Sequence, residues 1–346
     1  MSPAPHHVLH VAKWYPNPKD VQHGIFVKKQ IDALSVEQHT LAFVNEHFPP
    51  IHEPQLSLYG AQKMSWSVKL ATFIGTLSKA PYTIVHFHCF TPDLLPMAIY
   101  ARQKGLKIAY TEHFSGYLPE NLDRLSSLKN WATRQFLKRV DIAFPVSPVL
   151  ASALHTLYSS LPTQLVPNIV SDAPAVARKN EGTTAVKFLM VADIVFEIKR
   201  QDLVLKLFQN LPRMRAELHF IGGGPDQERL KDLASRAPNV YMHGRKSNEE
   251  VLEMLPEFDV HILYSAYESF GITTFEARKA GLWAITRASF GGSHWADEYC
   301  LMAENDEHLL TTMNDLLHGE RPSANSFHEL SATAVGQQIN SCYNEL

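Results

Sequence analysis

The sequence has little cysteine and no long apolar run, and these two absences exclude several classes of protein. Its three cysteines, Cys89, Cys300 and Cys342, are too few and too widely spaced for a disulfide framework or a cysteine zinc site. No apolar stretch reaches the roughly 18–20 residues that a membrane-spanning helix needs. The first residues, MSPAPHHVLHVAKWYP, lack the basic segment and the apolar core of a secretory signal. We therefore expect a cytoplasmic protein with reduced thiols.

Basic stripes, paired aspartates and a dinucleotide fingerprint are also missing. No dense run of Lys and Arg with interleaved aromatic residues occurs, so a nucleic-acid partner is disfavoured. No Asp-x-Asp triplet occurs, which favours chemistry without a divalent metal. The glycines at 222–224 do not form a G-x-G-x-x-G fingerprint at the first strand–helix unit, so a nicotinamide enzyme is disfavoured as well.

The two halves of the chain differ in charge. Residues 1–172 carry 15 Lys and Arg against 11 Asp and Glu, whereas residues 173–346 carry 17 against 24. The difference is either chance between two domains or a sign that the first half meets an anionic partner.

Strand-like and helix-like segments alternate along both halves, and the length allows two globular cores. Such alternation predicts an α/β fold with parallel sheets, whose ligands bind beyond the carboxyl ends of the strands. Between the halves, residues 173–185 show little periodicity, and we interpret them as a linker. The expected strands are 6–12, 39–44, 83–88, 106–113, 141–147 and 164–170 in the first half, and 186–192, 216–222, 239–244, 259–265 and 282–287 in the second.

The most informative segment is ESFGITTFEARKAG, residues 268–281, which follows the expected strand DVHILYS. Gly271 can start a helix, and the backbone N–H groups of Gly271 to Thr274 together with the helix dipole suit a diphosphate. Glu276 lies about one turn into that helix, where a carboxylate can accept two hydrogen bonds from a ribose diol. Glu268 stays in the loop, where it can face a sugar.

This segment resembles the Glu-x7-Glu signature of the retaining glycosyltransferases of the GT-B fold, glycosyltransferase family four (glycosyl transferases group 1). The similarity covers nearly the whole chain, including WYPNPKDVQHGIFVKKQIDAL, DIAFPVSPVLASAL, VPNIVSD, LHFIGGGPDQERLKDLA and NVYMHGRKSNEEVLEML. The resemblance implies two Rossmann-like domains facing across a cleft. The first, 1–173, would be the acceptor-side domain, and 184–324 would bind the nucleotide sugar. The C-terminal helix, 325–346, would cross back to the first domain.

The same resemblance implies roles for individual residues. His113, Glu268 and Lys199 would be catalytic, with His113 orienting a hydroxyl of the donor sugar and Lys199 contacting the diphosphate. Asp193 stands where the family usually carries an arginine that also contacts the diphosphate, which is a departure from the pattern. The implied donor-binding residues are Gly24, Asp193, Arg200, Gly223, Gly224, Phe270, Gly271, Ile272, Thr273, Glu276 and Gly292.

Two other patterns leave more than one interpretation open. His86 and His88 alternate on one strand and point to the same face, and without Asp, Glu or Cys ligands beside them we favour a structural or cleft-lining role over a metal site. Residues 126–140 form a basic amphipathic pattern around Trp131, Phe136 and Leu137. This helix either packs by its apolar face or docks on an anionic membrane surface or a lipid-linked acceptor.

Together these observations lead to a functional hypothesis. We expect a retaining, metal-independent glycosyltransferase without a cofactor, which moves a sugar from a nucleoside diphosphate sugar to a carbohydrate or lipid-linked acceptor in surface polysaccharide or glycolipid assembly. It would be cytoplasmic, either free or in peripheral contact with the inner face of the membrane. The alternatives are a nonhydrolysing sugar-nucleotide epimerase of the same architecture and a non-catalytic sugar-nucleotide-binding subunit.

Overall fold

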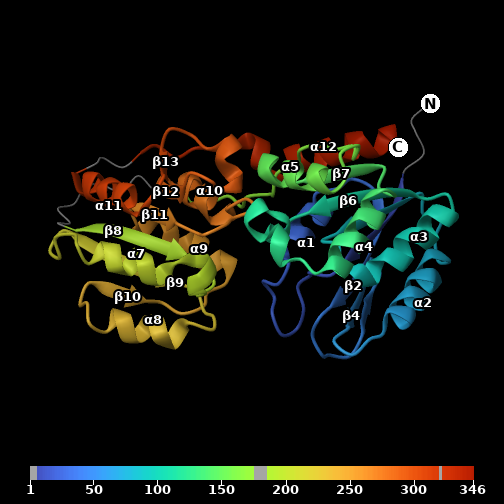
Figure 1. The fold of residues 1–346 in the computed structure, drawn as a ribbon, viewed down its shortest axis with the longest axis horizontal. Helices are drawn as coiled ribbons and strands as arrows, with labels where there is room; N and C mark the ends of the chain where they lie inside the picture. Colours follow the sequence, from blue (N-terminus) through green and yellow to red (C-terminus); the bar gives the residue numbers. More distant parts are fainter. Residues whose placement is uncertain (1–5, 175–184, 319–321) are drawn as a thin grey trace. The chain divides into compact units, whose positions relative to one another are not determined.

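The computed structural model describes residues 6–174, 185–318 and 322–346. The chain divides into two compact units, Met1–Ile169 with Glu329–Leu346, and Val170–His328. Each unit contains a largely parallel sheet with helices packed on it (Figure 1), so the predicted fold of two α/β domains is confirmed. Most of the predicted linker, residues 175–184, lies outside the described residues.

The first unit is built on a seven-stranded sheet in the order β3-β4-β2-β1-β5-β6-β7. β3 pairs antiparallel with β4, and all the other pairs are parallel, so the carboxyl ends of every strand except β3 lie at one edge of the sheet. The strands are β1 (His7–Ala12), β2 (Glu37–Val44), β3 (Ile51–Glu53), β4 (Leu56–Gly60), β5 (Ile84–His88), β6 (Lys107–Glu112) and β7 (Ile142–Pro145).

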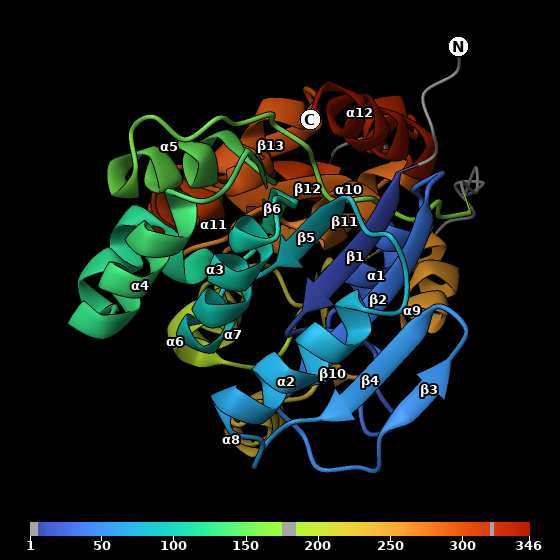
Figure 2. The same ribbon diagram turned by 90° about the vertical axis from the view of Figure 1, so that its right-hand side faces the viewer.

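Helices cover both faces of this sheet (Figure 2). α2, α3 and α4 lie on one face, where Phe136 of α4 contacts Phe87 and Tyr110 of the sheet. α1 and α12 pack on the other face, and α12 presents Val335 and Ile339 to the core. The C-terminal helix therefore belongs to the first unit, as predicted. The helices are α1 (Ile25–Asp32), α2 (Trp66–Leu77), α3 (Leu95–Gln103), α4 (Ser127–Leu137), α5 (Pro148–Leu157) and α12 (Ala332–Glu345).

The second unit has a six-stranded parallel sheet in the order β10-β9-β8-β11-β12-β13. Its strands are β8 (Val186–Val191), β9 (Ala216–Ile221), β10 (Val240–Met242), β11 (Val260–Leu263), β12 (Trp283–Arg287) and β13 (Cys300–Ala303). Its helices are α6 (Phe196–Lys199), α7 (Gln201–Phe208), α8 (Gln227–Ala234), α9 (Asn248–Met254), α10 (Ile272–Lys279) and α11 (Asp306–Asp315).

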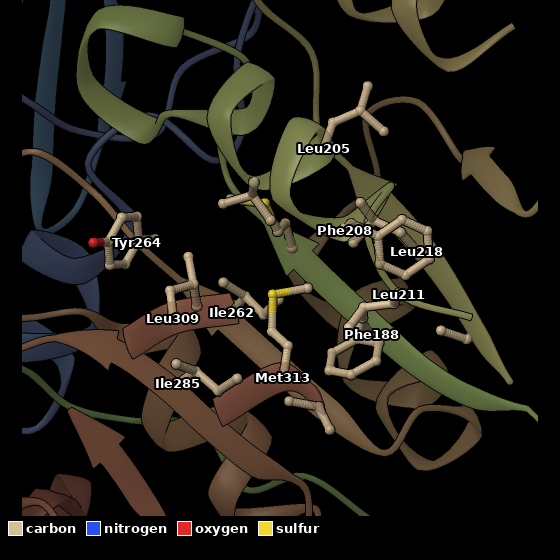
Figure 3. Close-up of a cluster of buried hydrophobic side chains, with 14 of the residues drawn as sticks. Phe188, Leu205, Phe208, Leu211, Leu218, Ile262, Tyr264, Ile285, Leu309 and Met313 are labelled. Atoms are coloured by element: carbon tan, nitrogen blue, oxygen red, sulfur yellow. The ribbon is translucent and has the colours of Figure 1, made fainter. Parts of the chain in front are cut away.

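One core of this second unit lies between the sheet and the helices α7 and α11 (Figure 3). Leu205 and Phe208 of α7 and Met313 of α11 meet the strand residues Phe188 and Ile262, all of them buried. The other face carries α9 and α10, joined to the sheet by a second apolar cluster. This second cluster fixes α10, the helix that contains Glu276, directly against the strands.

The predicted elements differ from the structure in a few places. The expected strand 164–170 is not a strand; its neighbour Thr163 forms one isolated bridge with Ala143. Pro167 cannot donate a hydrogen bond to a sheet, which explains the failure. The short edge strands β3 and β13 were not predicted, nor was β4, which lies between β3 and β2. Over the described part of the chain, no helix has the length and apolar character needed to cross a membrane.

Candidate functional site

The loop after β11 and the helix α10 form the most distinctive part of the second unit. Gly271 caps α10 in the left-handed region, with φ 87°, and a Cβ there would lie 2.9 Å from Cδ2 of Leu263. Ile272 and Thr273 begin the helix, where backbone N–H groups have no carbonyl one turn earlier to bond. The Thr274 N–H, expected to be open, instead donates to the Gly271 carbonyl at 3.1 Å. The helix end therefore offers fewer open donors than predicted.

Glu276 lies one turn into α10, and only 2% of its surface is exposed. Its Oε1 accepts a hydrogen bond from Nδ2 of Asn248, the first residue of α9, at 3.1 Å. The carboxylate is thus held between two helices that pack on the same face of the sheet. Asn248 is a neighbour that the sequence did not indicate, because 28 positions separate it from Glu276.

Lys199 and Glu268 form an ion pair. Nζ of Lys199, at the end of α6, lies 2.6 Å from Oε2 of Glu268, and both side chains are mostly buried. The carbonyl of Glu268 accepts the N–H of Gly291 at 3.0 Å, which ties the loop after β11 to the glycine segment after β12. The structure therefore brings together two of the three residues predicted to be catalytic.

The other predicted donor residues of this unit lie at the carboxyl ends of the same sheet. Arg200 adopts a left-handed conformation between α6 and α7, with its guanidinium 5.8 Å from the centre of the Tyr264 ring. Phe270 is buried against Phe275 and Trp295. Gly223 lies in the loop after β9.

Three of the predicted glycines are explained by close backbone approach. A Cβ at Gly24, Gly224 or Gly292 would lie 2.4, 2.5 and 2.4 Å from a backbone atom of a neighbouring loop. These contacts require glycine whether or not a ligand binds. The glycines therefore shape the loops, and they add no independent sign of a phosphate.

Asp193 lies just beyond the carboxyl end of β8. Its Oδ1 accepts a hydrogen bond from the Arg245 guanidinium at 3.0 Å, and both side chains are more than half exposed. Lys199, which follows the same strand, is bonded to Glu268 instead. Asp193 is thus paired with an arginine from a different loop, and this pair was not predicted.

His113 lies at the carboxyl end of β6 in the first unit. Its Nδ1 is 2.8 Å from Oδ1 of Asn168, and its ring is 4.6 Å from that of Phe26. Nε2 is buried and has no hydrogen-bond partner among the described residues. Burial lowers the pKa of His113 to about 3, although the bond to Asn168 opposes the shift, so the imidazole is neutral at pH 7.

Glu112 holds the turn that carries His113. Its Oε1 accepts the N–H groups of His113 and Phe114 at 2.8 and 2.7 Å, and its Oε2 accepts the hydroxyl of Tyr110. Burial raises the pKa of Glu112 to about 7, against the opposing effect of these hydrogen bonds. The sequence reasoning missed Glu112, although a carboxylate in the last position of an otherwise buried strand was a usable signal.

Gly24 joins His113 at the same end of the first unit. Gly24 contacts the backbone of Trp14, whose ring is 6.0 Å from Phe26. Phe26 in turn contacts His113. The predicted site residues therefore form two groups, with Gly24 and His113 in the first unit and the remainder in the second.

His86 and His88 lie on the α12 face of the first sheet beside His10, and all three are fully buried. Nδ1 of His10 is 3.0 Å from Nε2 of His88, and Gln38 contacts the other His10 nitrogen. His86 bonds Thr111 and the hydroxyl of Tyr343 in α12. Their nitrogens lie within 4.8 Å of one another, but these hydrogen bonds already account for His10 and His86. The geometry favours a structural network that fixes α12 to the sheet.

Two family models match the chain. Residues 5–173 match Glycosyltransferase Family 4, and residues 174–332 match Glycosyl transferases group 1. The chain belongs to the GT-B glycosyltransferases of family four. In this glycosyltransferase, the Lys199–Glu268 pair and the Glu276 carboxylate lie in the part matched by the group 1 model.

Solved structures support the fold of this glycosyltransferase. Sucrose-phosphate synthase from Thermosynechococcus elongatus aligns with a TM-score of 0.80 and 17% identity, covering 98% of this chain and 99% of that one. The lipopolysaccharide outer core galactosyltransferase WaaB aligns at 0.72 and 16%, covering 98% and 100%. Anabaena HepE, in complex with UDP and glucose, aligns at 0.72 and 13%, covering 98% and 99%. A search of curated protein sequences gives no match.

Proposed function

We propose that this glycosyltransferase transfers a sugar from a nucleoside diphosphate sugar to an acceptor hydroxyl, with retention of configuration and without a metal. The observation that carries the proposal is the segment 268–276. It combines a helix N-terminus, a buried carboxylate one turn later and a loop carboxylate bonded to a lysine. HepE, which resembles the chain in fold, is in complex with UDP and glucose. A second structure of similar fold, described as trehalose-6-phosphate from E. coli, is bound with UDP-2-fluoro glucose.

Each part of the segment has a role in donor binding. The first N–H groups of α10 and the helix dipole would hold the diphosphate, since a helix N-terminus favours anions. Glu276, already bonded to Asn248 through Oε1, would accept hydrogen bonds from the ribose diol. Glu268 would hold a hydroxyl of the donor sugar.

Charge stabilisation would carry the reaction. The diphosphate gains negative charge as the glycosidic bond breaks, so cations and oriented N–H groups lower the barrier more than they stabilise the bound donor. Lys199 supplies such a cation, and its bond to Glu268 holds its ammonium in place. The departing diphosphate would take the acceptor proton on the same face of the sugar, and the chain contributes positioning.

The first unit would supply neutral hydrogen-bonding groups. His113 is uncharged at pH 7, and its buried Nε2 suits a sugar hydroxyl better than proton abstraction. We propose an acceptor that is a carbohydrate or a lipid-linked glycan, in surface polysaccharide or glycolipid assembly. The exposed Trp131 and Leu128 of α4, beside basic residues, suit weak contact with an anionic membrane surface.

A panel of sugar nucleotides tests the proposal. Thermal-shift measurements first identify the nucleotide sugar that binds, and its consumption is then followed with and without a mixture of glycan acceptors. The proposal predicts acceptor-dependent release of the nucleoside diphosphate in the presence of a chelator. Conversion of the sugar nucleotide without an acceptor would indicate an epimerase. Binding without turnover across a broad acceptor panel would indicate a binding subunit.

A further inference from the structure

Arg245 lies in a position that the donor-site prediction did not include. It follows β10, directly after Gly244, and its guanidinium donates to Oδ1 of Asp193 beyond β8 at 3.0 Å. In the sheet, β9 separates β10 from β8. The arginine side chain therefore crosses the loop after β9 to reach Asp193.

The loop after β9 leaves room for this crossing. A Cβ at Gly223 would lie 3.4 Å from Nε of Arg245, at ordinary van der Waals contact, so the arginine side chain passes directly beside this glycine. Backbone bonds join the three loops, since the Gly222 N–H donates to the Gly244 carbonyl and the Ile194 N–H to the Gly223 carbonyl. The guanidinium is thus held above the carboxyl ends of three adjacent parallel strands, the edge where ligands of such sheets bind.

The opposite charges of Asp193 and Arg245 suit an anionic ligand at this edge of the sheet. An aspartate alone at this edge would repel a diphosphate, whereas pairing with Arg245 neutralises Asp193. The bond to Asp193 uses one of the five N–H groups of the guanidinium, and its planar fork matches phosphate oxygens. Both side chains are more than half exposed, so a ligand can reach them.

We propose that Arg245 binds the diphosphate of the donor and that Asp193 is a positioning residue that holds its guanidinium over the Gly223 loop. The inference rests on the proposed nucleotide-sugar site and adds a second cation to Lys199. Arg245 follows β10, which lies two strands from β8, and β11, the strand before α10, lies on the other side of β8. Arg245 therefore approaches the diphosphate from the side opposite α10.

Calorimetry on the intact protein tests the proposal with UDP, GDP and ADP, each compared with its own nucleoside. For the nucleotide that binds, Arg245→Ala should lower the affinity for the nucleoside diphosphate roughly 10- to 100-fold and leave the affinity for the nucleoside unchanged. Lys246→Ala is the matched control. It removes one positive charge from the same loop, where Lys246 pairs with Glu250 at 3.0 Å, and it should have little effect.

A double-mutant cycle tests the role of Asp193. Asp193→Ala should lower the affinity for the nucleoside diphosphate less than Arg245→Ala does. In the Arg245→Ala background, Asp193→Ala should cause no further loss of affinity. Asp193→Asn, which keeps an oxygen acceptor for the guanidinium, should recover part of the loss. Tighter binding by Asp193→Ala would overturn the positioning role, because it would show that the carboxylate only repels the ligand.

The controls separate this inference from the proposed function. Glu276→Ala weakens nucleotide binding if the site is correct. If Glu276→Ala is defective while Arg245→Ala matches the wild type, the Arg245 proposal fails and the proposed function stands. Equal losses for the nucleoside and the diphosphate would place Arg245 at the base and overturn its assignment to the diphosphate. If no nucleotide binds the wild type, both proposals fail.

Discussion

Replacement of Glu276 gives the most informative perturbation of the donor site. The carboxylate is 2% exposed and is fixed by Asn248, so it is preorganised for a ligand that approaches α10. Glu276→Ala removes charge-assisted hydrogen bonds worth roughly 1.5–3 kcal/mol, which corresponds to a loss of affinity of about 10- to 150-fold. Glu276→Gln keeps one oxygen that Asn248 can bond, but it removes the charge and replaces the second oxygen with an NH₂ donor, to which a ribose hydroxyl can bond only as an acceptor. Its loss of affinity should be about 5- to 15-fold.

The assay is isothermal calorimetry with the tightest-binding nucleoside diphosphate. Urea unfolding of each variant separates a loss of affinity from a loss of structure, because Glu276→Ala also leaves Asn248 with an altered environment. Glu249→Ala serves as the control, since Glu249 is exposed on the neighbouring helix α9 and carries the same charge. Unchanged affinity in both Glu276 variants, with normal unfolding, would refute the assignment of Glu276 to the ribose.

Four further outcomes are expected. Lys199→Ala, assayed at saturating donor, should lower kcat roughly 10²-fold, because a fixed cation near the leaving group is lost; a near wild-type kcat would displace the phosphate site. Activity should persist in a chelator, and a complete loss restored by magnesium or manganese would contradict metal independence. Co-sedimentation with phosphatidylglycerol vesicles should exceed that with neutral vesicles and should fall as the salt concentration rises. It should fall further in Trp131→Ala, because Trp131 is 56% exposed beside a basic helix face. Equal binding to neutral vesicles would exclude the electrostatic contact. Burial depresses the pKa of His113 to about 3, so its contribution to the free energy of unfolding is complete above about pH 6.5 and falls by about 1.4 kcal/mol per pH unit as the pH drops toward 3. The urea midpoint should therefore decline less steeply between pH 7.5 and 4.5 in His113→Gln than in the wild type. Equal slopes would contradict the burial of a neutral imidazole.

Local sequence patterns were sufficient where structure depends on near neighbours. The strand, Gly271 and Glu276 fall within one strand–turn–helix unit, so their order alone predicted the helix N-terminus and the carboxylate one turn later. Only the Thr274 N–H was misjudged, because a tight first turn bonds it to Gly271. The short strand β13 had no comparable pattern, since an edge strand of four residues carries little periodicity.

Contacts between distant positions could not be derived in this way. Asn168 lies 55 positions after His113, and Arg245 lies 52 positions after Asp193. These pairs depend on which strands become neighbours in the sheet and on which loops cross their ends. The resemblance to the family marked Asp193 as a departure from its usual arginine, but only the folded chain identifies the arginine that bonds to Asp193.

A crystal structure of the intact protein with its bound nucleoside diphosphate would test most directly whether α10 and Glu276 bind the donor. We expect ribose hydroxyls within hydrogen-bond distance of the Glu276 carboxylate, and diphosphate oxygens at the N–H groups of Ile272 and Thr273. A nucleotide bound elsewhere, with Glu276 and the start of α10 unoccupied, would contradict this expectation.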